Sequence, residues 1–199
     1  MPSKPKLKPR TKPAEERRED LMNSAERLFL EQGVGATTIE QITTGADVAK
    51  GTFYLHFSSK EDVLEALRNR FIASLLENIR QAVDKKKEDD WEGRLAAWCK
   101  ACVSAYLDAA RLHHVVFYEV PPPTREGLTN NVIIDYLTDL LAGGARAKAW
   151  SVTSPRLTAV FLFSAFHGVI VEEMTSEKRV SKARLAGEIS AHFFRTLGM

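Results

Sequence analysis

The chain has 199 residues, enough for one or two small domains with a hydrophobic core. Hydrophobic residues make up 44% of it and charged residues 27%, which is usual for a globular protein, and its two cysteines cannot form a disulfide framework. The longest apolar run, AVFLFSAFHGVIV, is broken by Ser164 and His167 and is shorter than the ~20 residues that a membrane helix needs. No apolar core follows the basic amino terminus, so no secretory signal is expected. These features predict a cytoplasmic protein that has no membrane partner.

The positive charge is concentrated at the amino terminus. The net charge is +2, but five of the 28 basic residues lie within residues 4–12, which leaves 23 bases against 26 acids in the rest of the chain. Residues 1–13 alternate Lys or Arg with Pro and should be disordered in isolation. A basic arm on a mildly acidic body favours a polyanionic partner. The alternative is a tail that only aids solubility.

Helical periodicity recurs along the amino-terminal part of the chain. A first helix is predicted from Pro13 to a stop at Gly33. Thr37 and Glu40 stand three residues apart and predict a capping box for a second, short helix. A third short helix carries Phe53 and Phe57. Ser58 and Glu61 predict another capping box, for a long helix over about 59–84.

The carboxy-terminal part continues the helical pattern. Asp89 or Asp90 can cap a helix that carries Trp91 to Tyr106, and another is predicted from about Arg125 to Ala142, closed by Gly143 and Gly144. The intervening segment HHVVFYEVPPP is ambiguous between helix and strand.

Two more helices complete the pattern. Ser154 and Pro155 predict the start of a helix that is apolar nearly all round from Leu157 to Val171, and Ser181 starts a last helix. No alternating strand pattern occurs in the sequence, so the predicted class is all-α.

The second and third helices, with the turn between them, form a helix-turn-helix pattern. Apolar residues of this unit can build a small core together with the first helix: Leu28, Phe29, Ile39, Ile42, Ala46, Val48, Phe53 and Phe57. The face of the third helix left exposed would then be Lys50, Gly51, Thr52, Tyr54 and His56. These side chains can donate hydrogen bonds or are too small to obstruct, as a helix in the DNA major groove requires.

The stretch from about residue 20 to 65 resembles the TetR family of transcriptional regulators. That family's signature is Ile-Ala-x-x-Ala-Gly-Val-Ser-x-Gly-Thr-x-Tyr, followed by a Phe and a Lys. The matching residues here are Ile42, Ala46, Val48, Gly51, Thr52, Tyr54, Phe57 and Lys60. The resemblance implies an amino-terminal three-helix DNA-binding domain over 14–58 and a helical ligand-binding and dimerisation domain over 59–199. It implies base contacts from Lys50, Gly51 and Thr52, and phosphate contacts from Thr38, Tyr54, His56 and Lys60.

Three positions depart from the family pattern. Thr43 replaces a small Ala, Asp47 stands where Gly is usual in the turn, and Ala49 replaces a Ser that would cap the third helix. Asp tolerates a left-handed backbone, so the turn can form. Between Ala14 and Phe57 there are four bases against eight acids, which gives the basic arm more weight as a DNA-binding element.

The resemblance also implies a dimer that binds a palindromic operator and is released by a small molecule. The apolar helix at 157–171 and the last helix favour an intersubunit four-helix bundle. Aromatic and soft side chains on the central helices suit a largely apolar or aromatic effector. The candidates are Trp98, Cys102, Tyr106, Phe117, Tyr118, Phe163, Phe166 and His167.

Three other functions remain open at this point. Cys99 and Cys102 form a CxxC, so a metal- or redox-responsive regulator is the alternative, although buried apolar cysteines are the simpler interpretation and no metal or cofactor is expected. A helical protein-interaction module is another, which the basic arm and the Lys50–Thr52 face argue against. We find no phosphate loop, no nucleophile elbow and no paired carboxylates in an apolar setting, so the sequence does not predict an enzyme.

Overall fold

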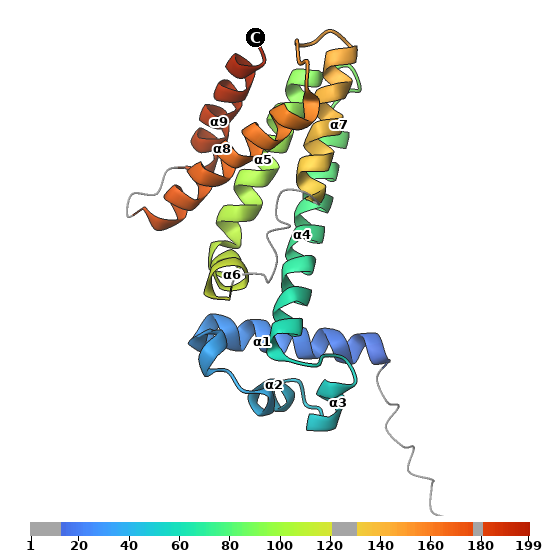
Figure 1. Cartoon of the computed structure of the whole chain (residues 1–199), viewed down its shortest axis with the longest axis vertical. Helices are drawn as coiled ribbons and strands as arrows, with labels where there is room; N and C mark the ends of the chain where they lie inside the picture. The colour runs from blue at the N-terminus through green and yellow to red at the C-terminus, as the bar shows by residue number, and fades with distance from the viewer. Residues whose placement is uncertain (1–12, 121–130, 177–180) are drawn as a thin grey trace, which may run out of the picture. The chain divides into compact units, whose positions relative to one another are not determined.

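The computed structural model describes residues 13–120, 131–176 and 181–199, and all regular structure in these ranges is helical (Figure 1). No strand occurs in them, which confirms the all-α prediction. The chain divides into two compact units, Met1–Leu67 and Arg68–Met199. The division falls within α4 (Lys60–Asp84), whose first two turns belong to the amino-terminal unit. The proposed basic arm lies almost entirely outside the described residues.

The amino-terminal unit places α1 (Ala14–Ala36) against α2 (Ile39–Gly45), which in turn packs on α3 (Lys50–Tyr54) (Figure 1). Gly33 interrupts α1 with a φ of 81°, so the predicted stop is a kink followed by a short extra turn. Six of the eight predicted core residues are buried, while Ile39 and Val48 are half-buried.

Both predicted capping boxes of this unit are wrong by one residue. The box of α2 is Thr38 with Gln41: the Gln41 amide donates to the Thr38 hydroxyl (3.2 Å), and the Thr38 amide donates to the Gln41 side chain (2.8 Å). Thr37 is buried instead, and its hydroxyl donates to the Gly33 carbonyl (2.8 Å). Thr37 and Thr38 each stand three residues before a Glu or Gln, so the spacing alone allows either of them to cap α2. Thr38 is the cap because Thr37 is packed in the core.

The same shift occurs at the start of α4. The Asp62 amide donates to the Ser59 hydroxyl (3.2 Å), and the Ser58 amide donates to the Asp62 carboxylate (2.8 Å). These hydrogen bonds hold the pKa of Asp62 below its usual value. Asp62 therefore takes the position predicted for Glu61.

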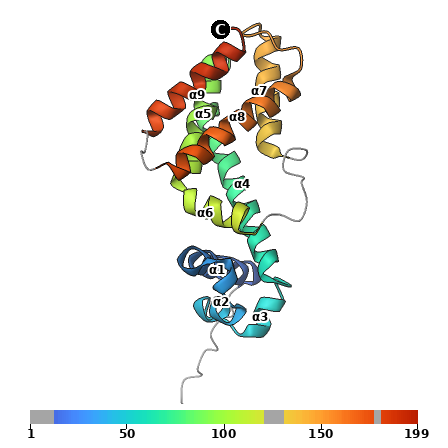
Figure 2. The ribbon, with the colours of Figure 1, turned by 60° about the vertical axis from the view of Figure 1, so that its left-hand side comes forward.

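The carboxy-terminal unit contains the rest of α4 together with α5 (Trp91–Asp108), α6 (Ala110–His114), a π-helix η1 (Val115–Glu119), α7 (Val132–Arg146), α8 (Pro155–Thr175) and α9 (Lys182–Thr196). The ambiguous segment after α5 is thus helical as far as Glu119. Helix α9 packs along α5, and α8 packs on α7 (Figure 2). Asp90 and Ser181 cap α5 and α9 as predicted, but Ser154 makes no side-chain capping bond to α8.

Gly143 and Gly144 do not close α7, contrary to the prediction. The helix continues to Arg146, and its predicted start near Arg125 lies outside the described residues. A Cβ on Gly143 would stand 2.6 Å from the ring of Trp91, and one on Gly144 would stand 2.1 Å from the ring of Trp150. The two glycines are therefore needed for close packing against tryptophans, inside the helix rather than after it.

Helix α8 has a buried apolar face and an exposed apolar face. Ala159, Leu162 and Phe166 are buried in the domain core, whereas Leu157 is 69% exposed and Phe161 62%. Within the described part of the chain, α8 is the one helix long and apolar enough to cross a membrane by length and composition, although the interrupted run predicted none. The described residues leave this second apolar face of α8 exposed.

Candidate functional site

The turn before α3 has the backbone that the sequence led us to expect. Asp47 has a φ of 53°, in the left-handed region that Asp tolerates better than most residues. Ala49 is the N-cap of α3 and makes no side-chain capping bond, so the helix lacks the cap that a Ser there would provide. Burial of Phe53 and Phe57, whose ring centroids lie 5.8 Å apart, holds this short helix in place.

The residues predicted to contact bases lie on the outer side of α3. Lys50 and Gly51 are exposed, and Thr52 is half-buried. A Cβ on Gly51 would meet nothing within 4 Å, so the packing of this chain does not require a glycine there. Glycine in a helix is unfavourable by about 0.5–1 kcal/mol relative to alanine. The open space at Gly51 therefore suits the close approach of another molecule.

The four residues predicted to contact phosphates differ in their surroundings. Tyr54 is 53% exposed and His56 is half-buried, while Thr38 is exposed but its side chain caps α2. The Lys60 ammonium group donates to two backbone carbonyls at the end of α1, those of Val34 (2.8 Å) and Thr37 (2.6 Å). Lys60 thus joins α4 to α1, a structural role that its match to the family signature did not reveal.

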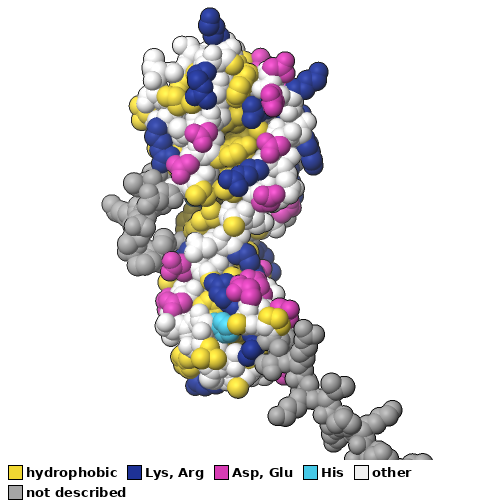
Figure 3. Space-filling model, turned by 90° about the vertical axis from the view of Figure 1, so that its right-hand side faces the viewer, with side chains coloured by type: hydrophobic (Ala, Val, Ile, Leu, Met, Phe, Trp, Pro, Cys, Tyr) yellow, Lys and Arg dark blue, Asp and Glu magenta, His cyan; other side chains and the backbone are white. Residues whose placement is uncertain are grey.

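Lys50 forms an ion pair with Glu40 of α2. The hydrogen bond and the opposite charge raise the pKa of Lys50 and lower that of Glu40. Two other bases of the unit also face glutamates: Arg18 lies near Glu15 and Glu19, and Arg27 near Glu31. Acidic and basic side chains are interspersed on the face of this unit shown in the lower part of Figure 3. The unit therefore presents no continuous basic surface on that face.

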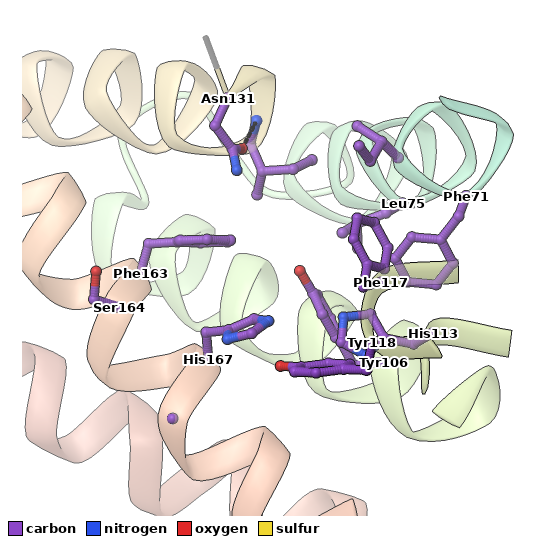
Figure 4. A pocket seen from close by; sticks show the side chains of 13 residues that line it. Phe71, Leu75, Tyr106, His113, Phe117, Tyr118, Asn131, Phe163, Ser164 and His167 are labelled. Atoms are coloured by element: carbon purple, nitrogen blue, oxygen red, sulfur yellow. Dashed lines mark hydrogen bonds between the residues drawn. The ribbon is translucent and has the colours of Figure 1, made fainter. Parts of the chain in front are cut away.

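A cavity of about 490 Å³ lies within the carboxy-terminal unit, between α4, α5, α6, η1, α7 and α8 (Figure 4). Its volume falls in the range usual for small-molecule sites. Of the eight predicted ligand residues, Tyr106, Phe117, Tyr118, Phe163 and His167 line it, and no described lining residue is charged. The remaining described lining residues are Phe71, Ile72, Leu75, His113, Asn131, Ile133, Ser164 and Gly168.

The other three predicted ligand residues lie in the packed core and not at the cavity wall. Trp98 and Cys102 are fully buried and Phe166 is 1% exposed; the Trp98 ring packs against those of Phe166 and Phe193. Phe71, Ile72 and Leu75 of α4 also line the cavity and were not predicted to do so. Those residues follow an ordinary apolar helix pattern, so nothing in the sequence distinguishes a cavity wall from a core face.

His113 is a buried polar residue of the cavity that was not among the predicted ligand residues. It is 2% exposed, and its Nδ1 has no hydrogen-bond partner among the described residues. Burial, together with the neighbouring His167 and His114, lowers the pKa of His113 to about 4. The imidazole is therefore uncharged at neutral pH.

Cys99 and Cys102 are both buried on α5. Burial raises the pKa of Cys99 to about 12 and that of Cys102 well above its usual value, so both remain thiols at neutral pH. No group of three or more His, Cys, Asp or Glu side chains within the described ranges could hold a metal ion. The geometry gives no support to the metal- or redox-responsive alternative.

Comparison with known proteins reveals a family match in the amino-terminal unit. Residues 21–67 match the model of the bacterial regulatory proteins of the tetR family. The transcriptional repressor KstR2 of Mycobacterium tuberculosis is 38% identical over 68 residues, which are 34% of this chain and 34% of that protein. The chain thus matches only about a third of the length of this relative.

Solved structures extend the likeness to the whole fold. A tetR-family regulatory protein from Rhodococcus RHA1 superposes with a TM-score of 0.70 at 21% identity, covering 91% of this chain and 96% of that one. The transcriptional regulator FadR of Bacillus subtilis, in complex with stearoyl-CoA, gives a TM-score of 0.73 at 19% identity, with coverages of 88% and 96%. The amino-terminal unit thus matches the tetR family of bacterial regulatory proteins, which confirms the resemblance found in the sequence, and the chain has the same fold as these solved structures.

Proposed function

We propose that the protein is a cytoplasmic transcriptional repressor that binds a palindromic operator in double-stranded DNA as a dimer and is released by a small molecule. The observation that carries this proposal is the outer face of α3. Lys50, Gly51 and Tyr54 are exposed there on a helix anchored by the buried Phe53. A short helix with donors and open space on one side fits the major groove, where Lys and Thr can read base edges.

A second copy of the chain is the proposed cover for the exposed face of α8. Leu157, Phe161 and Val169 are large apolar residues exposed on this helix. On α9, Gly187 is exposed within a helix and a Cβ there would meet nothing within 4 Å, which leaves room for close approach of another helix. Helices α8 and α9 of two copies would form a four-helix bundle. Two-fold symmetry then matches a palindromic operator.

The cavity of the carboxy-terminal unit is the proposed effector site. Its volume and its aromatic walls suit a small molecule, and the structurally similar FadR is known in complex with stearoyl-CoA. An effector releases the operator if it binds more tightly to a conformation with low DNA affinity. The cavity is therefore proposed as a regulatory site.

Selection of bound fragments from random DNA tests the proposal directly. The wild-type protein should enrich a two-fold symmetric sequence whose half-sites lie about one helical turn or more apart. The Lys50→Ala variant should lose discrimination between that sequence and a scrambled one in competition. Enrichment of no sequence, or unchanged discrimination by Lys50→Ala, would contradict the assignment of α3 as the reading helix.

The basic arm supplies a second test, based on charge. The amino-terminal unit is acidic from Ala14 to Phe57, so we expect the five charges of residues 4–12 to provide much of the attraction to phosphates. Deleting residues 2–12 should weaken binding to operator and random DNA alike, and should make log affinity depend less steeply on log salt. An unchanged slope would mean that the arm contributes no phosphate contacts.

A further inference from the structure

The cavity of the carboxy-terminal unit has a polar end built from aromatic side chains. We propose that it binds an uncharged, ring-bearing ligand whose hydroxyl or carbonyl group forms hydrogen bonds with Tyr106, His113, Tyr118 and His167. This inference rests on the proposed function only in treating the cavity as the effector site.

The four polar residues surround one part of the cavity. The ring centroid of His113 lies 5.0 Å from that of Tyr106, 5.8 Å from that of Tyr118 and 5.6 Å from that of His167. Figure 4 shows the hydroxyl groups of both tyrosines pointing toward the space beside Phe163 and His167. Residues from α5, α6, η1 and α8 therefore bring their polar atoms together at one place.

These polar atoms lack partners within the described protein. The Nδ1 of His113 is buried and has no hydrogen-bond partner among the described residues. The side chains of Tyr106, Tyr118 and His167 form no hydrogen bond with another described residue either, although Tyr118 is 46% exposed and His167 is half-buried. Buried polar groups are nearly always paired in folded proteins, because an unpaired one loses its hydration without compensation. A group of unpaired donors and acceptors at one cavity wall is therefore suited to a ligand that pairs with them.

The electrostatics of the wall select an uncharged ligand. None of the described lining residues is an acid, a lysine or an arginine. Burial lowers the pKa of both His113 and His167 and raises that of Tyr106, so these groups are uncharged at neutral pH. An anion or cation placed here would be desolvated without a countercharge, which is strongly unfavourable. The described wall thus offers no partner for the phosphates of a coenzyme A ester.

The remaining wall favours rings over flexible chains. Phe71 lies edge-on to Phe117 with ring centroids 5.9 Å apart, and Phe163 lies on the opposite side of the cavity (Figure 4). Aromatic side chains prefer edge-to-face or offset contacts with other rings at such distances. The polar end and the aromatic wall together indicate a ligand with an apolar ring system and a neutral polar head.

Three probes with one ring skeleton test this by calorimetric titration of the full chain at pH 7: biphenyl, 4-hydroxybiphenyl and biphenyl-4-carboxylate. Stearoyl-CoA serves as a fourth probe. We expect 4-hydroxybiphenyl to bind about tenfold more tightly than biphenyl, since its hydroxyl pairs with otherwise unpaired groups. The carboxylate and stearoyl-CoA should bind more weakly than 4-hydroxybiphenyl. Equal binding of the first two, tighter binding of either anion, or no binding of 4-hydroxybiphenyl at its solubility limit would overturn the proposal.

Conservative variants of three cavity residues identify which side chains form hydrogen bonds with the ligand. Tyr118→Phe and Tyr106→Phe each remove one hydroxyl from the cavity, and His113→Phe removes the ring nitrogens while keeping an aromatic ring. At least one should reduce the preference for 4-hydroxybiphenyl over biphenyl severalfold. Tyr136→Phe is the matched control, because it removes a hydroxyl from a half-buried tyrosine of α7 that does not line the cavity. If all three cavity variants keep the wild-type preference, the polar end is not the binding site.

The titration separates this proposal from the regulatory function. It detects ligand binding without DNA, so a protein that binds 4-hydroxybiphenyl selectively but selects no operator would refute only the regulatory function. A protein that selects an operator but discriminates none of the probes would refute only the ligand class.

Discussion

The two units keep their candidate functional residues in opposite environments. In the amino-terminal unit these residues come from one stretch, 38–60, and Lys50, Gly51 and Tyr54 are exposed beside a small core that they do not build. In the carboxy-terminal unit the cavity wall runs from Phe71 to Gly168 in the sequence and comes from six helical segments. Many of its residues are also the core of the domain.

This difference determines how separately function and stability can be changed in each unit. A side chain on the outer face of α3 can be removed without leaving a void, because solvent already surrounds it. A side chain at the cavity wall supports its neighbours, so its removal affects packing as well as any ligand. Arg68 illustrates the second case: its buried guanidinium group donates to the Val116 and Val120 carbonyls and so positions η1, which carries Phe117 and Tyr118.

The largest effect is expected at Phe161, which is exposed in the single chain and would be buried in the proposed dimer. Phe161 is 62% exposed in the single chain, so Phe161→Asp should leave the fold intact. If a second copy covers α8, the buried aspartate would disrupt the dimer and abolish tight operator binding. Light scattering should give about twice 22.3 kDa for the wild type and a monomer for the variant. Val132→Asp, at a 42% exposed position on α7, is the control and should remain dimeric.

The next largest effect is expected in the pH dependence of stability, which tests whether His113 in the cavity wall is buried and uncharged. Burial lowers the pKa of His113 to about 4 in the folded protein, below the usual 6.5 of histidine, so the unfolded chain takes up the proton first as pH falls. The free energy of unfolding therefore keeps the full contribution of His113 above pH 6.5. It falls as the pH drops from about 6.5 to 4, by roughly 3 kcal/mol at most. Between pH 7 and pH 4.5, the free energy of unfolding measured with urea should fall less for His113→Phe than for the wild type. An equal loss in both proteins would contradict the low pKa.

A pair of lysine variants sharpens the contrast within the amino-terminal unit. Lys50→Ala should reduce operator affinity about tenfold or more and leave the melting temperature nearly unchanged, since Lys50 is exposed and its ion pair is with the exposed Glu40. Lys60→Ala should lower the melting temperature, because it removes the hydrogen bonds from the ammonium group to the Val34 and Thr37 carbonyls, which join α4 to α1. Thermal melts and DNA titrations of both variants measure the two effects. A stable Lys60→Ala protein with weak DNA binding would instead favour its predicted phosphate contact.

The smallest effect is expected at Gly51. Because a Cβ there meets nothing within 4 Å, Gly51→Ala should stabilise α3 in the free protein by about 0.5–1 kcal/mol. The same methyl group should weaken DNA binding if bases approach this point closely. Urea unfolding and operator titration should therefore move in opposite directions. Gly35→Ala, at another open position of the unit, is the control and should leave DNA binding unchanged.

Local patterns predicted the features that depend on residues close together in the sequence and predicted the cavity less well. The all-α class, the left-handed Asp47 and the capping of α5 by Asp90 follow from residue types and short spacings. The errors arose where two residues satisfied the same rule, as at Thr37 and Thr38, or where one residue type has two uses. Gly143 and Gly144 were predicted to end a helix, but they lie within α7 and leave room for the rings of Trp91 and Trp150.

The sequence by itself determined the helical class, the resemblance of its amino-terminal part to a known family and the outer face of α3, because periodicity, caps and a signature motif act within a few residues of one another. Only the tertiary structure decided which aromatic residues face a cavity and which fill the core. Trp98 and Tyr106 lie on the same apolar side of α5, yet one packs fully and the other borders empty space. That distinction depends on how closely α4, α7 and α8 approach, and packing over such distances in the sequence has no local signal.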